Sequence, residues 1–286
     1  MSDLVSLPDA LRFIERSTPL YIDLAHTVRK RTCAGEFSFF CVVCNGVRRA
    51  LPSDDWNLRN SLVCEECGHG SRQRHAFQVI QDVVSLQAAV KQHLPTRLIF
   101  EEVTAFKSLL DFTFGNFRGS EYLGPDKIGG QVYSSTGRNI VHEDLCNLSH
   151  ESNSVDLMVS MDVLEHVPDL SKALQECFRV LKPGGIKVMT VPFYNQRRSI
   201  QRAEVRDGQI IHLLPQEFHG NPMSADGSLV FSEPGIDLID SIDECGFSTQ
   251  ISIGANLERG YFPDGNPYIE AHTWNLVFVL GKPRGI

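Results

Sequence analysis

Residues 154–193 have the sequence SVDLMVSMDVLEHVPDLSKALQECFRVLKPGGIKVMTVPF. The continuous apolar run at 155–160 predicts a buried strand, and apolar positions recur at helical spacing over 168–181. A Lys-Pro-Gly-Gly turn then gives the backbone the freedom to reverse into a second buried strand at 186–192. The stretch therefore predicts one parallel strand–helix–strand unit, which is expected to be right-handed.

Outward from this unit, strands and helices alternate along residues 96–286. The predicted strands are 97–102, 117–122, 139–142, 155–160, 186–192, 248–253 and 274–281. The predicted helices are 104–112, 168–181 and 234–245. This alternation predicts an α/β fold with a doubly wound, mostly parallel seven-stranded sheet. The long polar stretch 193–232 interrupts the alternation and is expected to be a lid or a substrate loop.

The N-terminal part of the chain divides into three predicted pieces. Residues 1–37 form a helical segment that Pro19 breaks or kinks, and residues 38–75 form a cysteine-rich module without a sustained period. Residues 76–95 continue as a connecting helix that ends at a proline. A single domain, residues 96–286, then follows.

Two C-x2-C pairs in the cysteine-rich module have the spacing of a four-cysteine zinc site. The ligands would be Cys41, Cys44, Cys64 and Cys67. Four protein ligands leave no open coordination position, so the predicted zinc ion is structural and stabilises a segment with little apolar content. The alternatives are two incidental cysteine pairs or a redox pair, and His69 or His75 could replace one ligand.

Composition narrows the classes of function. The net charge of −8 disfavours a protein whose affinity depends on phosphate contacts, although arginines near the cysteine pairs leave nucleic-acid contact open. No signal peptide is visible and no stretch has the ~20 apolar residues that span a bilayer. Eight cysteines without an export signal indicate thiols or metal ligands. The sequence predicts a cytoplasmic protein.

The segment quoted above resembles the S-adenosylmethionine-dependent methyltransferases of the Rossmann-like class. The resemblance rests on VDLMVSMDVLEH, on ECFRVLKPGG and on IKVMTVPF, and with weaker matches it extends over residues 96–286. The four-cysteine module followed by SRQRHAF also resembles that of some bacterial methyltransferases of uncertain substrate. The resemblance implies the fold and S-adenosylmethionine as cofactor, and it leaves the methyl acceptor open.

The resemblance also implies cofactor-binding residues. The acidic end of the second strand, Glu121 with Gly119 before it, would hold the ribose hydroxyls, because the two oxygens of a carboxylate can each accept a hydrogen bond from a hydroxyl. In HEDLCNLS, Asp144 and Leu145 would lie at the adenine. The end of the fourth strand would pass under the methionine part of the cofactor, at Met161 and Asp162.

The family's first motif, an acidic residue followed by Gly-x-Gly, is absent, and IFEEVTAF stands in its place. Glycines let a backbone approach a pyrophosphate, and S-adenosylmethionine has none. Glu102 could instead accept hydrogen bonds from the cofactor's ammonium, and Thr104 could cap the following helix. The alternative is a degenerate site on a non-catalytic, methyltransferase-like scaffold.

Histidines are the candidates for removing a proton from a methyl acceptor. His219 in the polar stretch is the predicted general base, and His166 in LEHV has a catalytic or a supporting role. Glu217 and Tyr194 are predicted acceptor contacts, and no carboxylate cluster indicates a second metal site. The predicted function is O-methylation of a small molecule or a sugar. The rival enzyme is an RNA methyltransferase that grips its substrate with the zinc module.

Overall fold

A computed structural model describes residues 3–90, 94–195 and 197–284 of the chain. The chain divides into two compact units. Unit 1 comprises Met1–Val90, Pro192–Arg198 and Gln250–Phe278. Unit 2 comprises Lys91–Val191, Ser199–Thr249 and Val279–Ile286. The predicted boundaries between an N-terminal segment, a cysteine module, a connecting helix and one long domain stay predictions.

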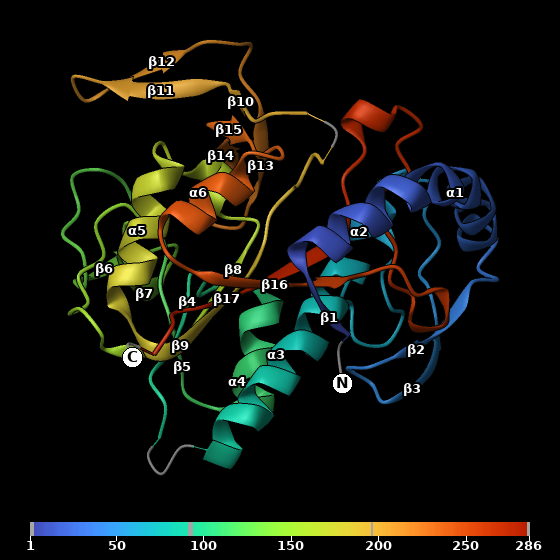
Figure 1. Cartoon of the computed structure of the whole chain (residues 1–286), viewed down its shortest axis with the longest axis horizontal. Coiled ribbons are helices and arrows are strands. Elements are labelled where there is room, and N and C mark those ends of the chain that lie inside the picture. Colours follow the sequence, from blue (N-terminus) through green and yellow to red (C-terminus); the bar gives the residue numbers. More distant parts are fainter. Residues whose placement is uncertain (1–2, 91–93, 196, 285–286) are drawn as a thin grey trace. The chain divides into compact units, whose positions relative to one another are not determined.

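Parallel strands form the centre of unit 2 (Figure 1). β4 (Arg97–Ile99) pairs in parallel with β5 (Phe117–Gly119) on one side and with β8 (Val155–Met161) on the other. β8 also pairs in parallel with β9 (Leu181–Thr190). All seven residues of β8 are buried, which is typical of a strand covered on both faces.

The whole sheet has seven strands in the order β1-β16-β17-β9-β8-β4-β5. The remaining members are β1 (Leu4–Ser6), β16 (Ser248–Ile253) and β17 (Leu276–Gly281), and β1 pairs antiparallel with β16. The predicted mostly parallel, seven-stranded α/β fold is confirmed.

One predicted strand is present but does not belong to this sheet. Residues 139–142 fall in β7 (Arg138–Val141), which forms an antiparallel hairpin with β6 (Val132–Ser135). A parallel bridge between Glu121 and His142 and a hydrogen bond from the Leu123 amide to His142 Nδ1 link this hairpin to the segment after β5. Over four residues, a strand of a hairpin and an edge strand of a sheet have the same apolar pattern, so the sequence does not distinguish them. The seventh strand of the sheet is β1.

Helix caps and glycines shape the strand–helix–strand unit. Asp169 caps α5 (Leu170–Val180) by accepting a hydrogen bond from the Lys172 amide. The register between β8 and β9 jumps from Val155–Leu181 to Leu157–Ile186, so residues 182–185 bulge out of the ladder. Gly184 lies in the bulge at φ 78°, a conformation that favours glycine.

The other helices of unit 2 are α4 (Ala105–Phe114), α6 (Leu238–Glu244) and the 3-10 turn η1 (Leu164–His166). The predicted lid segment contains short antiparallel pairs. They are β10 (Ile200–Gln201) with β15 (Ser232–Glu233), β11 (Ala203–Arg206) with β12 (Gln209–His212), and β13 (Phe218–Asn221) with β14 (Ser224–Leu229). The β11–β12 and β13–β14 pairs are hairpins, and both lie in sequence between the paired strands β10 and β15 (Figure 1).

In unit 1 the long helix α1 (Leu7–Cys33) continues through Pro19, so of the two predicted effects of this proline the break does not occur and the kink stays a prediction. The other elements of unit 1 are short except for α3. They are β2 (Ser38–Cys41), β3 (Gly46–Arg49), α2 (Leu58–Ser61), α3 (Ser71–Val90), η2 (Leu257–Arg259) and η3 (Ile269–Ala271). Within the described ranges, no helix has the length and apolar content needed to cross a bilayer.

The side chain of Arg74 stabilises the cysteine-rich segment of unit 1 through buried hydrogen bonds. Its side chain is fully buried, and its guanidinium lies 4.0 Å from the centroid of the Phe39 ring. It donates hydrogen bonds to the carbonyls of Leu62 (2.9 Å), His69 (2.9 Å) and Gly260 (2.6 Å). One side chain therefore joins the loop between the two cysteine pairs to a segment far along the chain.

We expect Arg74→Met to lower the free energy of unfolding by about 3 kcal/mol, because three buried carbonyls each lose a hydrogen bond. The carbonyl of His69 keeps the amide of Cys64 as a second donor. Arg72→Met is the matched control, since Arg72 belongs to the same helix, is half-buried and donates to the Asn60 side chain. Its cost should stay below about 1 kcal/mol. Urea unfolding measures both, and equal losses would contradict the role given to Arg74.

The turn between β4 and α4 is shaped by side chains in place of glycines. Thr104 caps α4 by accepting a hydrogen bond from the Lys107 amide (3.1 Å), as predicted. Glu102 lies over Gly119 of β5 so closely that a Cβ on Gly119 would collide with Glu102 Oε2 and lie 2.8 Å from the Glu101 carbonyl oxygen. The glycine that this region needs is therefore on the neighbouring strand.

Gly119→Ala should lower the free energy of unfolding by about 1–3 kcal/mol through this overlap. In a Glu102→Ala background the same substitution should cost at least about 0.5 kcal/mol less, because one collision partner has been removed. Urea-unfolding midpoints of the four proteins give the coupling energy. Additive costs would show that the Glu102 side chain does not fill the space beside Gly119.

Candidate active site

The carboxyl ends of β5, β4 and β8 lie side by side at one edge of the sheet, because these neighbouring strands are parallel. In open α/β sheets this edge is where ligands bind. Three acidic residues follow these ends: Glu102 after β4, Glu121 after β5 and Asp162 after β8. All three were predicted from the sequence to be cofactor-binding residues.

Glu121 is held by the backbone of the glycine-free turn. Its Oε1 accepts hydrogen bonds from the amides of Glu102 (2.7 Å) and Val103 (3.3 Å). Burial raises the pKa of Glu121 and the Glu102 carboxylate adds to the rise, while the two amides oppose it. Within the described part of the chain, no hydrogen bond involves Oε2. One carboxylate oxygen thus fixes the turn and the other remains for a ligand.

Glu102, the predicted partner of a cofactor ammonium, already has a cationic neighbour. Lys107 Nζ lies 3.4 Å from Glu102 Oε2 and also 2.6 Å from Asp111 Oδ2. The Glu102 side chain is about one-third exposed, so it is open to solvent as well. A ligand ammonium would have to share this carboxylate with Lys107.

Asp144 and Leu145, the predicted adenine contacts, lie in the loop after β7. Asp144 Oδ1 accepts a hydrogen bond from the Cys146 amide (2.8 Å), and the Leu145 side chain is buried. The aspartate therefore folds its own loop into a turn.

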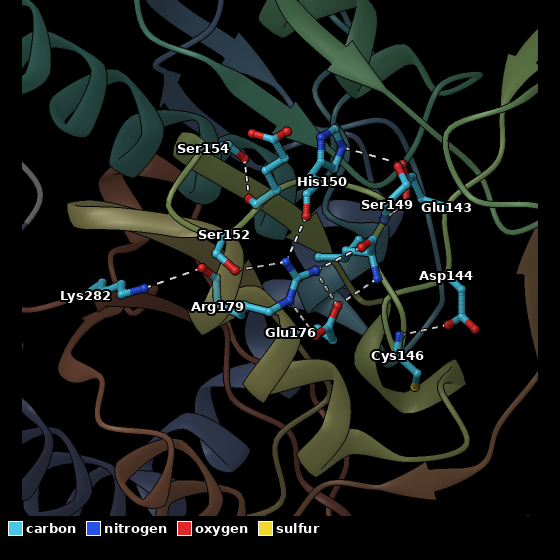
Figure 2. Close-up of polar contacts among 12 residues, drawn as sticks. Glu143, Asp144, Cys146, Ser149, His150, Ser152, Ser154, Glu176, Arg179 and Lys282 are labelled. Carbon is cyan, nitrogen blue, oxygen red and sulfur yellow. Dashed lines mark hydrogen bonds and ion pairs between the residues drawn. The ribbon is translucent and has the colours of Figure 1, made fainter.

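Arg179 of α5 anchors the continuation of this loop (Figure 2). It donates to the carbonyls of Leu148 (2.9 Å) and His150 (2.9 Å) and to Ser152 Oγ (3.3 Å). It also pairs with Glu176 at 2.7 Å. The guanidinium thus fixes the loop's backbone to the helix that follows β8.

Asp162, at the end of β8, has a left-handed backbone with φ 53°. Thr190 on β9 supports it, because Thr190 Oγ1 donates to Asp162 Oδ1 (2.8 Å) and accepts from the Asp162 amide (3.1 Å). Met161 before it is buried. A non-glycine residue in this conformation costs energy and is found more often at functional sites.

The two predicted catalytic histidines lie together, although they are far apart in sequence. The rings of His166 in η1 and His219 in β13 have centroids 5.0 Å apart and meet edge to face. Glu165 lies between them, with Oε1 3.7 Å from His219 Nδ1 and 3.8 Å from His166 Nε2. The pKa of His219 is raised, chiefly by the interaction with Glu165.

Sequence reasoning missed Glu165, the central member of this cluster. Its side chain is 1% exposed, and among the described residues neither carboxylate oxygen has a hydrogen-bond partner. The available signal was its place in LEHV, directly before a chosen histidine and after a strand end.

The two predicted acceptor contacts fall in different units. Glu217 Oε1 lies 3.5 Å from His219 Nε2, and its Oε2 lies 3.2 Å from Arg202 Nη2, so Glu217 belongs to the histidine cluster. Tyr194 belongs to unit 1, where the guanidinium of Arg197 lies 3.9 Å from the centroid of its ring. The roles of both residues stay predictions.

The four predicted cysteine ligands converge in unit 1, with all four sulfurs within 4.8 Å of one another. Cys41 and Cys67 have sulfurs 3.7 Å apart, and those of Cys44 and Cys64 are 3.9 Å apart. The interaction with Cys67 is the main cause that lowers the pKa of Cys41 to about 5. The nearby His75 is engaged elsewhere, with Nε2 2.8 Å from Ser252 Oγ.

Comparison with known proteins gives a partial match. Residues 121–189 match the sequence profile of the methyltransferase domain family. A probable S-adenosylmethionine-dependent methyltransferase of Mycolicibacterium smegmatis is 28% identical over 143 residues, which are 49% of this chain and 48% of that protein. A ubiquinone biosynthesis O-methyltransferase of Pseudomonas savastanoi pv. phaseolicola is 33% identical over 82 residues, 29% of this chain and 34% of that protein.

A crystal structure of an S-adenosylmethionine-dependent methyltransferase from Mesorhizobium loti aligns with 69% of this chain and 95% of its own, at 15% identity and a TM-score of 0.41. The matched segments span half or less of the length of the curated relatives. The profile match includes Glu121, Asp144, Asp162 and the Glu165–His166 pair. Residues 121–189 are therefore similar to the methyltransferase domain family.

Proposed function

We propose that the protein is an S-adenosylmethionine-dependent methyltransferase that methylates a small molecule or a sugar, at oxygen. The observation that carries the proposal is the match of residues 121–189 to the methyltransferase domain family, combined with acidic residues at the carboxyl edge of the parallel strands. The names of two relatives, a ubiquinone biosynthesis O-methyltransferase and a demethylmenaquinone methyltransferase, support a small-molecule acceptor.

The cofactor would lie along this edge. Glu121 would accept hydrogen bonds from the ribose hydroxyls through its uncommitted Oε2, and Glu102 would share its charge between Lys107 and the ammonium. Asp144 with Leu145 would face the adenine. The other proposed cofactor contacts are Thr104, Gly119, Met161 and Asp162.

Methyl transfer is an in-line displacement, in which the acceptor oxygen forms a bond to the methyl carbon while the carbon–sulfur bond breaks. The electron pair of that bond stays on sulfur. The protein must align the two reactants and remove the acceptor's proton. The histidine cluster would do the second task, and in the simplest form of the proposal His219 takes the proton while Glu165 and His166 support it.

We also propose that the four cysteines hold a structural zinc ion. Four sulfurs that each lie roughly 2.3 Å from one zinc ion in a tetrahedron are about 3.8 Å apart, and the separations of 3.7 Å and 3.9 Å agree with this geometry. Buried Arg74 near these sulfurs would offset part of the negative charge of a four-thiolate site.

The cofactor proposal predicts binding of S-adenosylhomocysteine to the purified, zinc-loaded protein in titration calorimetry. Glu121→Ala should weaken it roughly 10- to 100-fold, because a charge-assisted hydrogen bond is lost. Glu151→Ala, which removes an exposed carboxylate of the same unit, should leave the affinity unchanged. Well-folded wild-type protein that binds neither S-adenosylhomocysteine nor S-adenosylmethionine would favour the scaffold alternative.

The zinc proposal predicts at least one zinc ion per chain by elemental analysis, since the four cysteines form one complete site. Cys64→Ser should lose the metal and lower the unfolding temperature, because metal binding contributes to folding. Cys33→Ser should keep it, since Cys33 is an exposed thiol outside the cluster. A wild-type protein that is folded and free of zinc after purification without chelators would contradict the proposal.

A further inference from the structure

We propose that Glu165, His166 and His219 bind a divalent transition-metal ion, separate from the four-cysteine site. Each residue offers one ligand atom, and the three atoms lie within 4.8 Å of one another. This inference deepens the proposed function and rests on it for the role of the ion in the reaction. Whether the ion binds is a separate question that the experiment answers first.

The first argument is the state of the Glu165 carboxylate. The side chain is 1% exposed, and among the described residues neither oxygen accepts a hydrogen bond. A buried carboxylate in this state is costly unless a cation lies beside it. Its neighbours at 3.7 Å and 3.8 Å are two imidazole nitrogens, which are the usual companions of a carboxylate around a transition metal.

The second argument is the orientation of His166. Its Nδ1 lies 2.8 Å from the carbonyl oxygen of Leu229. A carbonyl oxygen accepts and does not donate, so Nδ1 carries the proton of this contact. In the neutral ring Nε2 then presents a lone pair toward the Glu165 carboxylate. Two electron-rich groups that face each other call for a cation, and a backbone carbonyl on the second nitrogen is the usual partner of a metal-bound histidine.

The third argument is the chain of groups behind His219. Its Nε2 lies 3.5 Å from Glu217 Oε1, and Glu217 Oε2 lies 3.2 Å from Arg202 Nη2. Arg202 is also paired with Glu233. When Nε2–H donates to Glu217, Nδ1 directs its lone pair at Glu165. A carboxylate held by an arginine orients the imidazole, as in carboxylate–histidine–metal arrangements.

The ligand set indicates the kind of ion. Ligand atoms that each lie roughly 2.1 Å from one ion are about 3–3.5 Å apart, so the two histidines need to approach Glu165 by a few tenths of an ångström. Two imidazoles and one carboxylate favour Zn²⁺, Mn²⁺, Fe²⁺ or Co²⁺ over the oxygen-preferring Mg²⁺. Three protein ligands leave coordination positions open for an acceptor oxygen.

In the reaction, an acceptor hydroxyl on the ion would lose its proton to water, because a Lewis acid lowers the pKa of a bound hydroxyl. The resulting oxyanion forms the bond to the methyl carbon, the carbon–sulfur bond breaks, and its electron pair stays on sulfur. His219 is then a metal ligand that holds the ion, and the ion takes over the activation that a general base would provide. No oxidant or reductant is needed.

The test is Mn²⁺ binding to the full-length protein after it has received one molar equivalent of zinc, enough for the cysteine site alone, and unbound zinc has been removed. Electron paramagnetic resonance measures the free Mn²⁺, and Co²⁺ absorption is the second probe. We expect one saturable site per chain. His219→Ala and Glu165→Gln should weaken binding by more than roughly tenfold, and Glu217→Gln by about tenfold. His212→Ala, an exposed histidine in the same segment, should change nothing.

Zinc content and S-adenosylhomocysteine affinity are measured on the same samples, so that loss of folding or of the cofactor site is recognised. His219 is about 39% exposed, which makes His219→Ala the variant least prone to unfold the protein. The proposal is overturned if zinc-loaded wild-type protein binds neither Mn²⁺ nor Co²⁺ stoichiometrically, or if the His219→Ala variant binds these ions as tightly as the wild type does. Binding of S-adenosylhomocysteine without metal binding would leave the methyltransferase proposal standing with His219 as base.

Discussion

The parallel pairing of β8 with strands on both sides is the constraint on which the candidate site depends. All seven residues of β8 are buried between β4 and β9, so the strand cannot shift without exposing apolar side chains or losing both ladders. Its last residue and the next, Met161 and Asp162, are therefore fixed at the edge where β4 and β5 also end. Thr190 of β9 holds Asp162 in its left-handed conformation, and the strain is balanced by the same pairing.

The turn after β4 shows how a carboxylate can organise a loop that glycines organise in dinucleotide-binding units. In those units the backbone must approach a phosphate closely, and its amides point at the ligand. Here Glu121 Oε1 accepts hydrogen bonds from the amides of Glu102 and Val103. Gly119 on the neighbouring strand leaves space for the Glu102 side chain. The result is an acidic edge, which suits a cationic ligand without phosphates better than a nucleotide pyrophosphate.

Much of the sheet could be predicted from sequence because β8 and β17 are mostly apolar runs and the helices beside the sheet have clear caps. Asp169 and Thr104 cap their helices as capping residues do, and local signals of this kind need no tertiary information. The strand predicted at 139–142 is present but pairs outside the central sheet, and the helix does not break at Pro19. A four-residue apolar pattern does not specify its partner strand, and α1 packs well enough to keep its helix through a proline.

The four cysteines were predictable because the spacing of their pairs is a local property, and the structure brings their sulfurs together. Contacts between residues far apart in the sequence could not be predicted. Ser71 Oγ accepts a hydrogen bond from the amide of Phe262, and nothing near Ser71 in the sequence indicates a partner almost two hundred residues away. Glu165 was missed because burial decides its chemistry, and a carboxylate after a strand end looks the same in sequence whether it is solvated or enclosed.

Because Glu165 is buried, the position of the hairpin formed by β13 and β14 depends on whether a cation neutralises the Glu165 carboxylate. Its backbone carbonyl accepts a hydrogen bond from the amide of Phe231 (2.8 Å), and the next residue, His166, reaches the carbonyl of Leu229. The strand that these bonds hold is the partner of the strand with His219. A cation between Glu165 and the histidines would therefore draw the hairpin toward η1, while an uncompensated carboxylate would favour separation and access of water. The cation that activates the acceptor would then also hold the β13–β14 hairpin against η1. Activation of the acceptor and closure of the hairpin around it would therefore be coupled.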